Sequence, residues 1–301
     1  MRLSKGRVAA AVGGSAAAAA AGYAYYASRD RLPPLDSALQ PGRSLNCRLS
    51  SVEAVSRDSA RFTFSLPTPK HKLGLPVAAH LVAVRAWQGA VDASSVSRAY
   101  TPVTVDGIDE PGSFALVIKR YPNGFFSEQF HKLKVGDTMD FQGPVVTFLY
   151  APNVVPTISM IAAGTGITPM YQILRAALTD AADLTTFDLL YASRTEEDIL
   201  LRGDLDELAA KYPKRLRLTY VVSAAQSAEA TAVRVGRIGA ESISETLPPP
   251  APRSLVLVCG PEGLMNDLCG PRNRDGTRPP LRGALKALGY QTRQVVRFDP
   301  S

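Results

Sequence analysis

A glycine-rich turn between an apolar run and a helical pattern is the segment of the chain best suited to bind an anion. The turn consists of Ala163, Gly164, Thr165, Gly166, Ile167, Thr168, Pro169 and Met170. Thr168 is the expected N-cap and Pro169 the first helical residue, so free amides and the positive helix end would face a ligand such as a nucleotide pyrophosphate. Strand-to-helix turns also need glycine for steric reasons alone, and the motif by itself leaves that interpretation open.

A second turn follows an apolar strand pattern at residues 255–259 and supplies a thiol. Cys259, Gly260 and Pro261 form this turn, and Met265 follows four residues after the proline. Ligands of parallel α/β sheets bind at the carboxyl ends of the strands, so two such turns in one sheet would flank one ligand, with Cys259 beside it. A cysteine buried in the core at the end of a strand is the alternative.

A third segment, in the first half of the chain, combines three chemical groups within four residues. Arg98, Ala99, Tyr100 and Thr101 offer a cation for phosphate, an aromatic face for stacking and a hydroxyl for hydrogen bonding. In a strand, Arg98 and Tyr100 share one face while Thr101 points to the other. Taken alone, an ordinary edge strand with an exposed arginine explains this segment better.

Two domains of different texture are expected to position these segments. Residues 45–150 hold short β-type runs broken by glycine and proline, at 61–66, 81–85, 114–119 and 138–141. This texture is typical of an antiparallel sheet or barrel. Residues 151–301 alternate strand and helix patterns, which favours a parallel sheet with crossover helices. The expected strands are residues 157–163, 187–192, 216–222, 255–259 and an edge strand at 294–298, with helices at 169–178 and near 205–212.

Composition excludes several classes of protein. The 301 residues carry a formal charge of +7, and a basic excess near the C-terminus comprises Arg272, Arg274, Arg278, Arg282 and Lys286. These cations lack interleaved aromatic residues and any zinc-finger or recognition-helix pattern, so nucleic-acid binding is not expected. An acidic protein partner or a merely solvated loop explains them. The three cysteines show neither disulfide nor metal-ligand spacing, and no metal site is expected.

The N-terminal segment, residues 1–31, is expected to be a targeting or membrane segment. Residues 8–27 carry no charge and are long enough to span a bilayer as a helix, although alanine and glycine make them only weakly apolar. An uncleaved anchor, a removed targeting peptide and a soluble helix are the interpretations, in that order of preference. Residues 32–44, which contain prolines, are interpreted as a linker.

The three chemical motifs, in this order, resemble the ferredoxin-reductase superfamily and most closely its NADH-cytochrome b5 reductase family, of the fungal mitochondrial type with a short N-terminal anchor. The likeness includes GLPVAAH at 74–80, VIKRY at 117–121, KVGDTMDFQGP at 134–144, ASRTEEDILLR at 192–202 and LGYQTRQVVRF at 288–298. The resemblance implies two domains. An antiparallel Greek-key β-barrel at 45–150 would bind FAD, and an α/β parallel-sheet domain at 151–301 would bind a nicotinamide nucleotide.

The resemblance also implies roles for individual residues. Arg98 would contact the FAD pyrophosphate, Tyr100 would pack on the flavin and Thr101 would hydrogen-bond near its N5 atom. His80 would help to relay the flavin proton, and the catalytic set would be Thr101, His80 and Cys259. Further FAD contacts would come from Ala99, Val117, Ile118, Lys119, Gly124, Phe125, Phe126, Ser127 and Thr168. The nicotinamide nucleotide would contact Gly164, Thr165, Gly166, Ile167, Pro169, Met170, Ser193, Arg194, Ser223, Cys259, Gly260, Pro261 and Met265.

Two positions depart from the family pattern. Family members commonly have Gly-Lys-Met-Ser at 124–127, where this chain has Gly-Phe-Phe-Ser, so a cationic phosphate contact is absent and Lys119 or Arg120 could substitute. At the end of strand 216–222, family members often have an aspartate, which selects NADH because its charge repels the 2'-phosphate of NADPH. This chain has Ser223 there, which does not repel the phosphate. Arg194 could even favour NADPH. NADH is the expected donor and NADPH the alternative.

The resemblance predicts a flavoprotein oxidoreductase that takes hydride from NADH onto FAD and passes single electrons to an acidic haem protein such as cytochrome b5. The basic residues at 272–286 could steer that partner. One alternative is a reductase of the same architecture for mitochondrial haem attachment or another acceptor. A non-catalytic scaffold without flavin is another, suggested only by Phe125 and Phe126. The expected location is the mitochondrial membrane, at the outer membrane or intermembrane-space side, with the endoplasmic reticulum membrane as the alternative.

Overall fold

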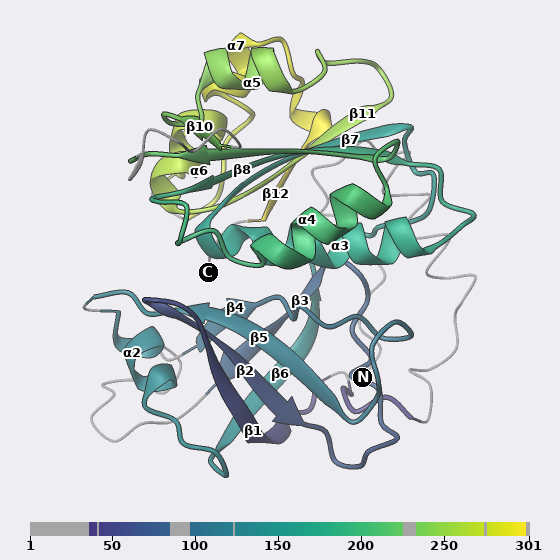
Figure 1. Cartoon of the computed structure of the whole chain (residues 1–301), viewed down its shortest axis with the longest axis vertical. Coiled ribbons are helices and arrows are strands. Elements are labelled where there is room, and N and C mark those ends of the chain that lie inside the picture. The colour runs from purple at the N-terminus through teal and green to yellow at the C-terminus, as the bar shows by residue number, and fades with distance from the viewer. Residues whose placement is uncertain are drawn as a thin grey trace.

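Two six-stranded sheets, one in each of two domains, make up the strands of the described part of the chain (Figure 1). The computed structural model describes residues 36–40, 42–84, 97–122, 124–224, 233–273 and 276–298. The predicted N-terminal segment, Arg274 and the side chain of Phe125 lie outside the described residues. No helix in the described ranges is both long and apolar enough to cross a membrane.

The first sheet is antiparallel, as predicted, with the strand order β4-β3-β6-β1-β2-β5. Its elements are β1 (Leu45–Ser56), β2 (Ser59–Ser65), β3 (Ala79–Val84), β4 (Ser97–Tyr100), β5 (Ser113–Lys119), helix α2 (Phe125–His131) and β6 (Thr138–Val146). Alternating residues of these strands fill an aromatic core in which the rings of Phe64 and Phe141 lie 5.0 Å apart, edge to face. The segment that follows β4 is hydrogen-bonded to the other end strand, β5, where Val103 N donates to Ala115 O at 2.9 Å.

The second sheet is parallel, as predicted, with the order β10-β9-β8-β7-β11-β12. Its strands are β7 (Thr157–Ala163), β8 (Thr186–Ser193), β9 (Leu216–Val222), β10 (Val233–Val235), β11 (Ser254–Cys259) and the edge strand β12 (Val295–Phe298). The helical elements are η3 (Gly164–Gly166), α3 (Ile167–Thr179), α4 (Arg202–Lys211), α5 (Ala240–Thr246), α6 (Glu262–Cys269), α7 (Gly283–Ala287) and η4 (Thr292–Gln294). Helices α3 and α4 cover the face toward the first domain, and α5, α6 and α7 lie on the other side (Figure 1).

The predicted start of helix α3, at Pro169 with Thr168 as N-cap, was wrong by two residues. The 3-10 turn Gly164–Gly166 continues directly into the helix, so Gly166 occupies the cap position and the helix begins at Ile167. Thr168 is therefore not the N-cap, and its hydroxyl donates to Thr165 O at 3.1 Å instead. Pro169 still lies in the first helical turn, where its missing N–H removes no intrahelical bond.

Candidate active site

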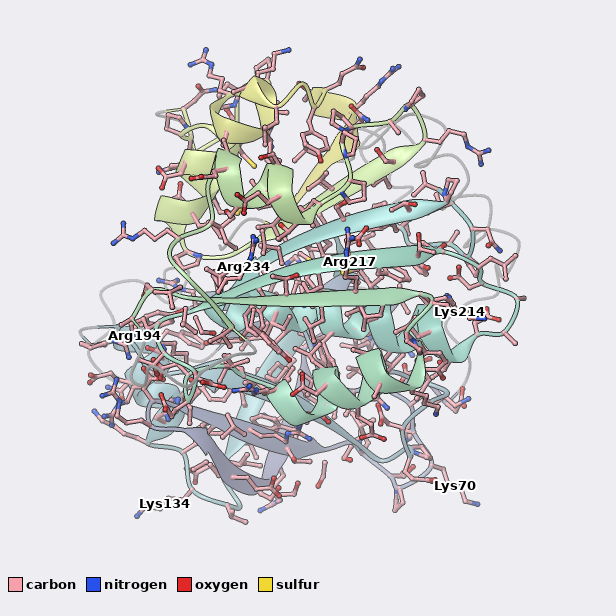
Figure 2. All side chains as sticks on the ribbon, turned by 45° about the horizontal axis from the view of Figure 1, so that its top comes forward. Lys70, Lys134, Arg194, Lys214, Arg217 and Arg234 are labelled. Atoms are coloured by element: carbon pink, nitrogen blue, oxygen red, sulfur yellow. The ribbon has the colours of Figure 1, made fainter. Side chains whose placement is uncertain are left out.

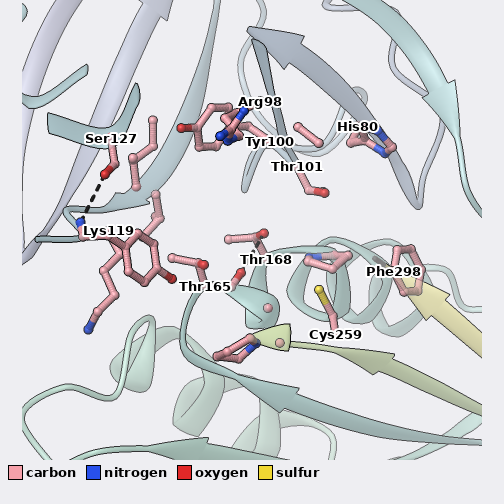
Figure 3. Close-up of a pocket in the computed structure, with 18 of the residues that line it drawn as sticks. His80, Arg98, Tyr100, Thr101, Lys119, Ser127, Thr165, Thr168, Cys259 and Phe298 are labelled. Carbon is pink, nitrogen blue, oxygen red and sulfur yellow. Dashed lines mark hydrogen bonds between the residues drawn. The ribbon is translucent and has the colours of Figure 1, made fainter. Parts of the chain in front are cut away.

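A cleft of about 500 Å³ lies between the two domains and brings together all three chemical motifs. Figure 3 shows Arg98, Tyr100, Thr101 and His80 on one side of it, and Thr165, Thr168, Cys259 and Phe298 on the other. The predicted residues that line it are His80, Arg98, Ala99, Tyr100, Thr101, Val117, Ile118, Lys119, Gly124, Phe126, Ser127, Thr165, Gly166, Thr168, Pro169, Cys259, Gly260 and Pro261.

An aromatic wall supports the first-domain side of the cleft. The Tyr100 ring lies 6.1 Å from Phe126 and 5.5 Å from Phe130, measured between ring centroids. Burial raises the pKa of the Tyr100 hydroxyl, which therefore stays protonated and can donate a hydrogen bond. Phe126 is buried beneath this wall, so its large side chain serves the packing behind Tyr100.

Two cations border the cleft, Lys119 and Arg98, and among the described residues only Lys119 has a carboxylate close by. Lys119 Nζ lies 2.8 and 3.0 Å from the two carboxylate oxygens of Asp58, which sits in the β1–β2 turn. Burial works to raise the pKa of Asp58, but the hydrogen bond and charge of Lys119 and the hydroxyls of Ser59 and Ser56 lower it below its ordinary value. Arg98 is exposed and donates to Ser97 O at 2.7 Å. Arg98 is therefore better placed than Lys119 to meet a phosphate, and Arg120 does not line the cleft.

His80 supplies a neutral imidazole to the cleft. Burial lowers the pKa of His80, so the ring is uncharged at neutral pH and can either accept or donate a proton. Its Nδ1 atom lies 3.4 Å from Thr147 Oγ1. Thr147 also lines the cleft, and no sequence motif pointed to it.

The two turns of the parallel sheet meet because β7 and β11 are neighbouring strands. A Cβ atom placed on Gly166 would lie 2.3 Å from Cys259 O, so only glycine allows this approach. Gly164 has φ +55° and open space where a Cβ would be, which leaves the turn accessible. Ile167, Met170 and Met265, also predicted as site residues, are fully buried core side chains and do not line the cleft.

A further group of predicted residues lies at the carboxyl ends of β8 and β9, outside the cleft lining. Ser223 is exposed, and its hydroxyl donates to Arg194 O at 3.3 Å. Arg194 Nη2 donates to Asp58 of the first domain and Nε to Asp198, both at 3.3 Å. Arg194 thus lies near the boundary between the domains (Figure 2), with two carboxylates as partners.

Sequence reasoning missed four residues that line the cleft: Tyr121, Thr147, Glu262 and Phe298. Tyr121 ends the VIKRY segment and Phe298 ends LGYQTRQVVRF, so both lay within recognised segments without an assigned role. Glu262 follows Pro261 directly. Among the described residues, no group of three or more His, Cys, Asp or Glu side chains could hold a metal ion.

Comparison with known proteins gives the family. A family model described as an oxidoreductase FAD-binding domain matches residues 46–150, and one described as an oxidoreductase NAD-binding domain matches residues 160–270. NADH-cytochrome b5 reductase 2-A of Vanderwaltozyma polyspora is 39% identical over 250 residues, which cover 83% of this chain and 82% of that protein. The chain belongs to the NADH-cytochrome b5 reductase family.

Other members support this assignment over the whole length. An NADH-cytochrome b5 reductase-like protein of Arabidopsis thaliana is 36% identical over 308 residues, covering 99% of this chain and 90% of that protein. The crystal structure of the cytochrome b5 reductase domain of Ulva prolifera nitrate reductase matches with a TM-score of 0.74 and 30% identity, covering 87% of this chain and 100% of that chain. The ferredoxin-reductase fold implied by the sequence is thereby confirmed.

The residues of the cleft fit the two nucleotides that the family's domains bind. Arg98 offers a cation that would suit the FAD phosphates, and the Tyr100 ring offers a flat face. Strand β5 is an end strand of its sheet, and Val117, Ile118 and Lys119 line the cleft. Its backbone could therefore meet a ligand there, although the Ile118 carbonyl already lies 3.0 Å from His131 Nε2. The open turn at Gly164 and the start of the 13-residue helix α3 suit the phosphates of a second nucleotide.

Proposed function

We propose that the protein is an FAD-dependent reductase that takes hydride from NADH and passes electrons singly to a haem protein such as cytochrome b5. The observation on which this rests is that the FAD-type and nucleotide-type motifs line one cleft from opposite domains. Bound FAD would supply the step from two-electron to one-electron transfer. The protein itself would contribute to catalysis by holding the two nucleotides in contact and by excluding water.

The residues of the cleft have the following proposed roles. Arg98 binds the FAD phosphates, Tyr100 packs against the ring system and Thr101 hydrogen-bonds near its reactive nitrogen. His80, neutral at pH 7, holds or releases the proton that accompanies reduction. Thr165, Gly166 and Thr168 form the opposite wall, and Cys259 lies beside the nicotinamide position.

Stopped-flow spectroscopy of the purified flavoprotein tests this function directly. Mixing with NADH should bleach the flavin absorbance in one fast phase, and a second mix with oxidised cytochrome b5 should restore it. A colourless protein that rejects added FAD would support the scaffold alternative. Fast reduction by NADH without transfer to cytochrome b5 would favour another haem protein as acceptor.

The donor preference is predicted to depend on Ser223. Ser223→Asp would place a carboxylate beside the backbone of Arg194, where the ribose of the donor is expected. A like charge repels the 2'-phosphate, so kcat/KM for NADPH should fall by about tenfold or more while that for NADH changes little. Ser223→Asn is the matched uncharged control, and equal losses with both donors would contradict the prediction.

The surface that we propose for docking of the haem protein includes only part of the basic run 272–286. Arg278 is only 5% exposed and donates to Asn266 and Gly270, and both it and Arg272 pair with Glu262. Of the described cations in this run, Arg282 and Lys286 are the exposed ones.

Removing these two charges should slow cytochrome reduction selectively. Arg282→Ala with Lys286→Ala should lower the rate of cytochrome b5 reduction at low salt about threefold or more, and leave ferricyanide reduction unchanged. Lys70→Ala with Lys214→Ala removes the same charge from exposed sites away from this run (Figure 2) and should have no such effect. Equal slowing with both acceptors would rule out docking at this surface.

We further propose a mitochondrial membrane location, with the endoplasmic reticulum as the alternative. Five basic side chains against one acid in residues 1–31 support a targeting or anchoring role for that segment. Fractionation of cells that express the full chain or residues 32–301 would test both location and anchoring. Release of the shorter chain from membranes is the expected result.

A further inference from the structure

Gln172 is a buried amide that joins the two domains. It lies in helix α3 and is 2% exposed. Its Oε1 atom accepts a hydrogen bond from Ala78 N at 2.7 Å, and its Nε2 atom donates to Pro102 O at 3.2 Å. Both partners are backbone groups of the first domain, so one side chain spans the interface.

Gln172 and its two hydrogen-bond partners are each close in sequence to a residue that lines the cleft. Thr168 precedes Gln172 by four residues and lies on the same face of α3. Pro102 follows Thr101, and Ala78 precedes His80 by two residues. Thr168, Thr101 and His80 all line the cleft. Gln172 therefore links the second-domain wall of the cleft to two residues of its first-domain wall.

An amide at this position does what an apolar side chain could not. The surrounding core cluster includes residues of both domains, and its apolar contacts are less directional than hydrogen bonds. The two hydrogen bonds of Gln172 add a defined length and direction to this packing. Ala78 has φ +67°, a left-handed conformation that is rare for alanine, and Gln172 holds its N–H.

The ion pairs between the domains are more exposed than Gln172. The Arg175–Asp109 pair has side chains 20% and 29% exposed, and in the Arg194–Asp58 pair the arginine side chain is 58% exposed. Solvent and salt weaken such pairs, whereas the bonds of Gln172 are shielded. Gln172 is thus better able than these ion pairs to set the spacing across the cleft. The buried bond from the Tyr150 hydroxyl to Asp183 also joins the two domains, but neither of its residues lines the cleft.

We propose that Gln172 is a positioning residue for hydride transfer, which fixes Thr168 against Thr101 and His80 and so sets the distance between the bound nucleotides. This inference rests on the proposed function for its kinetic consequence. A misplacement of about 1 Å can slow a reaction about 100-fold. Loss of Gln172 should therefore act on the rate of flavin reduction rather than on NADH affinity.

The first test compares two buried glutamines. Gln172→Leu should lower the rate constant of flavin reduction at saturating NADH about tenfold or more, with little change in the apparent Kd for NADH. Gln294→Leu is the matched control, because Gln294 is also buried and bonds two backbone groups, Ala251 O and Gln291 N, within one domain. Equal rate losses in the two variants would overturn the proposal.

The second test uses the protonation state of a substituted side chain. In Gln172→Glu, a protonated carboxyl can accept from Ala78 N and donate to Pro102 O, whereas a carboxylate cannot donate. Burial raises the pKa of such a carboxyl, so the reduction rate should be close to wild type at about pH 5.5 and fall toward about pH 8.5. A pH profile parallel to that of the wild-type protein would count against the proposal.

A third measurement is independent of activity. Hydrogen exchange of the Ala78 amide should be slow in the wild-type protein and in Gln294→Leu, and fast in Gln172→Leu. If NADH fails to reduce the wild-type protein, the proposed function is wrong. Exchange at Ala78 would still test whether Gln172 holds the two domains together. Unchanged protection of Ala78 in Gln172→Leu would show that Gln172 does not hold this segment.

Discussion

Gly166→Ala is expected to slow flavin reduction by NADH about 100-fold and to lower the free energy of unfolding by about 1–3 kcal/mol. The backbone of Gly166, with φ −61° and ψ −7°, suits alanine, so the cause is steric. The added Cβ would lie 2.3 Å from Cys259 O and 2.8 Å from Gly260 N, which are backbone atoms that cannot rotate away. The turns after β7 and β11 must then separate, and both form the nucleotide side of the cleft.

A second glycine provides the control for this variant. Gly203 lies in helix α4 with open space around its missing Cβ, and alanine is the better helix former. Gly203→Ala should leave the reduction rate unchanged and stabilise the fold by up to about 1 kcal/mol. Stopped-flow reduction and urea unfolding measure both quantities. A Gly166→Ala protein reduced nearly as fast as the wild-type protein would show that the two turns do not need this contact.

Arg98→Ala is expected to raise the Kd for FAD about tenfold or more. A charge-assisted hydrogen bond contributes about 1.5–3 kcal/mol, and about 1.4 kcal/mol corresponds to tenfold in affinity. The chain has no lysine at Phe125 or Phe126, and the charge of Lys119 is compensated by Asp58. No other described cation is as well placed to replace Arg98.

The flavin content after gel filtration and a fluorescence titration of the FAD-free protein measure this effect. Arg120→Ala is the matched control, because Arg120 is an exposed cation one residue beyond β5 that does not line the cleft. Lys119→Ala should lower flavin content less than Arg98→Ala does. Full flavin occupancy in Arg98→Ala would show that the phosphates are bound elsewhere.

Much of the fold could be predicted because apolar periodicity dominates the elements of the second domain. Strands β7 and β9 have the bounds that the sequence predicted, since each is rich in apolar residues and is followed by small or polar residues. The start of α3 was misplaced because a 3-10 turn has no signal of its own and Thr168 resembles a cap. The short helices α2, α5, α6 and α7 were not predicted, because five to eight residues hold too few helical turns for a period to show.

The candidate site was predictable where strand ends meet and unpredictable where distant side chains pair. Gly166 and Cys259 were expected together because the carboxyl ends of parallel strands share one edge of a sheet. Arg278 was expected to face an acidic partner or to lie in a solvated loop, yet the structure buries it beside Glu262. Likewise, nothing local to Asp58 or Arg194 indicates that they form an ion pair, since the two residues are 136 positions apart.

The contacts of Arg194 have a consequence for the evolution of donor preference. Asp58 binds Arg194 from the first domain, and Ser223 donates to the Arg194 backbone from the second. Substitutions at Asp58 and Ser223 should therefore be epistatic, because Asp58 binds the side chain of Arg194 and Ser223 binds its backbone. Selection for the use of NADPH should recover changes in the β1–β2 hairpin as well as at the nucleotide site. A mutant library restricted to residues near the donor would therefore leave out Asp58.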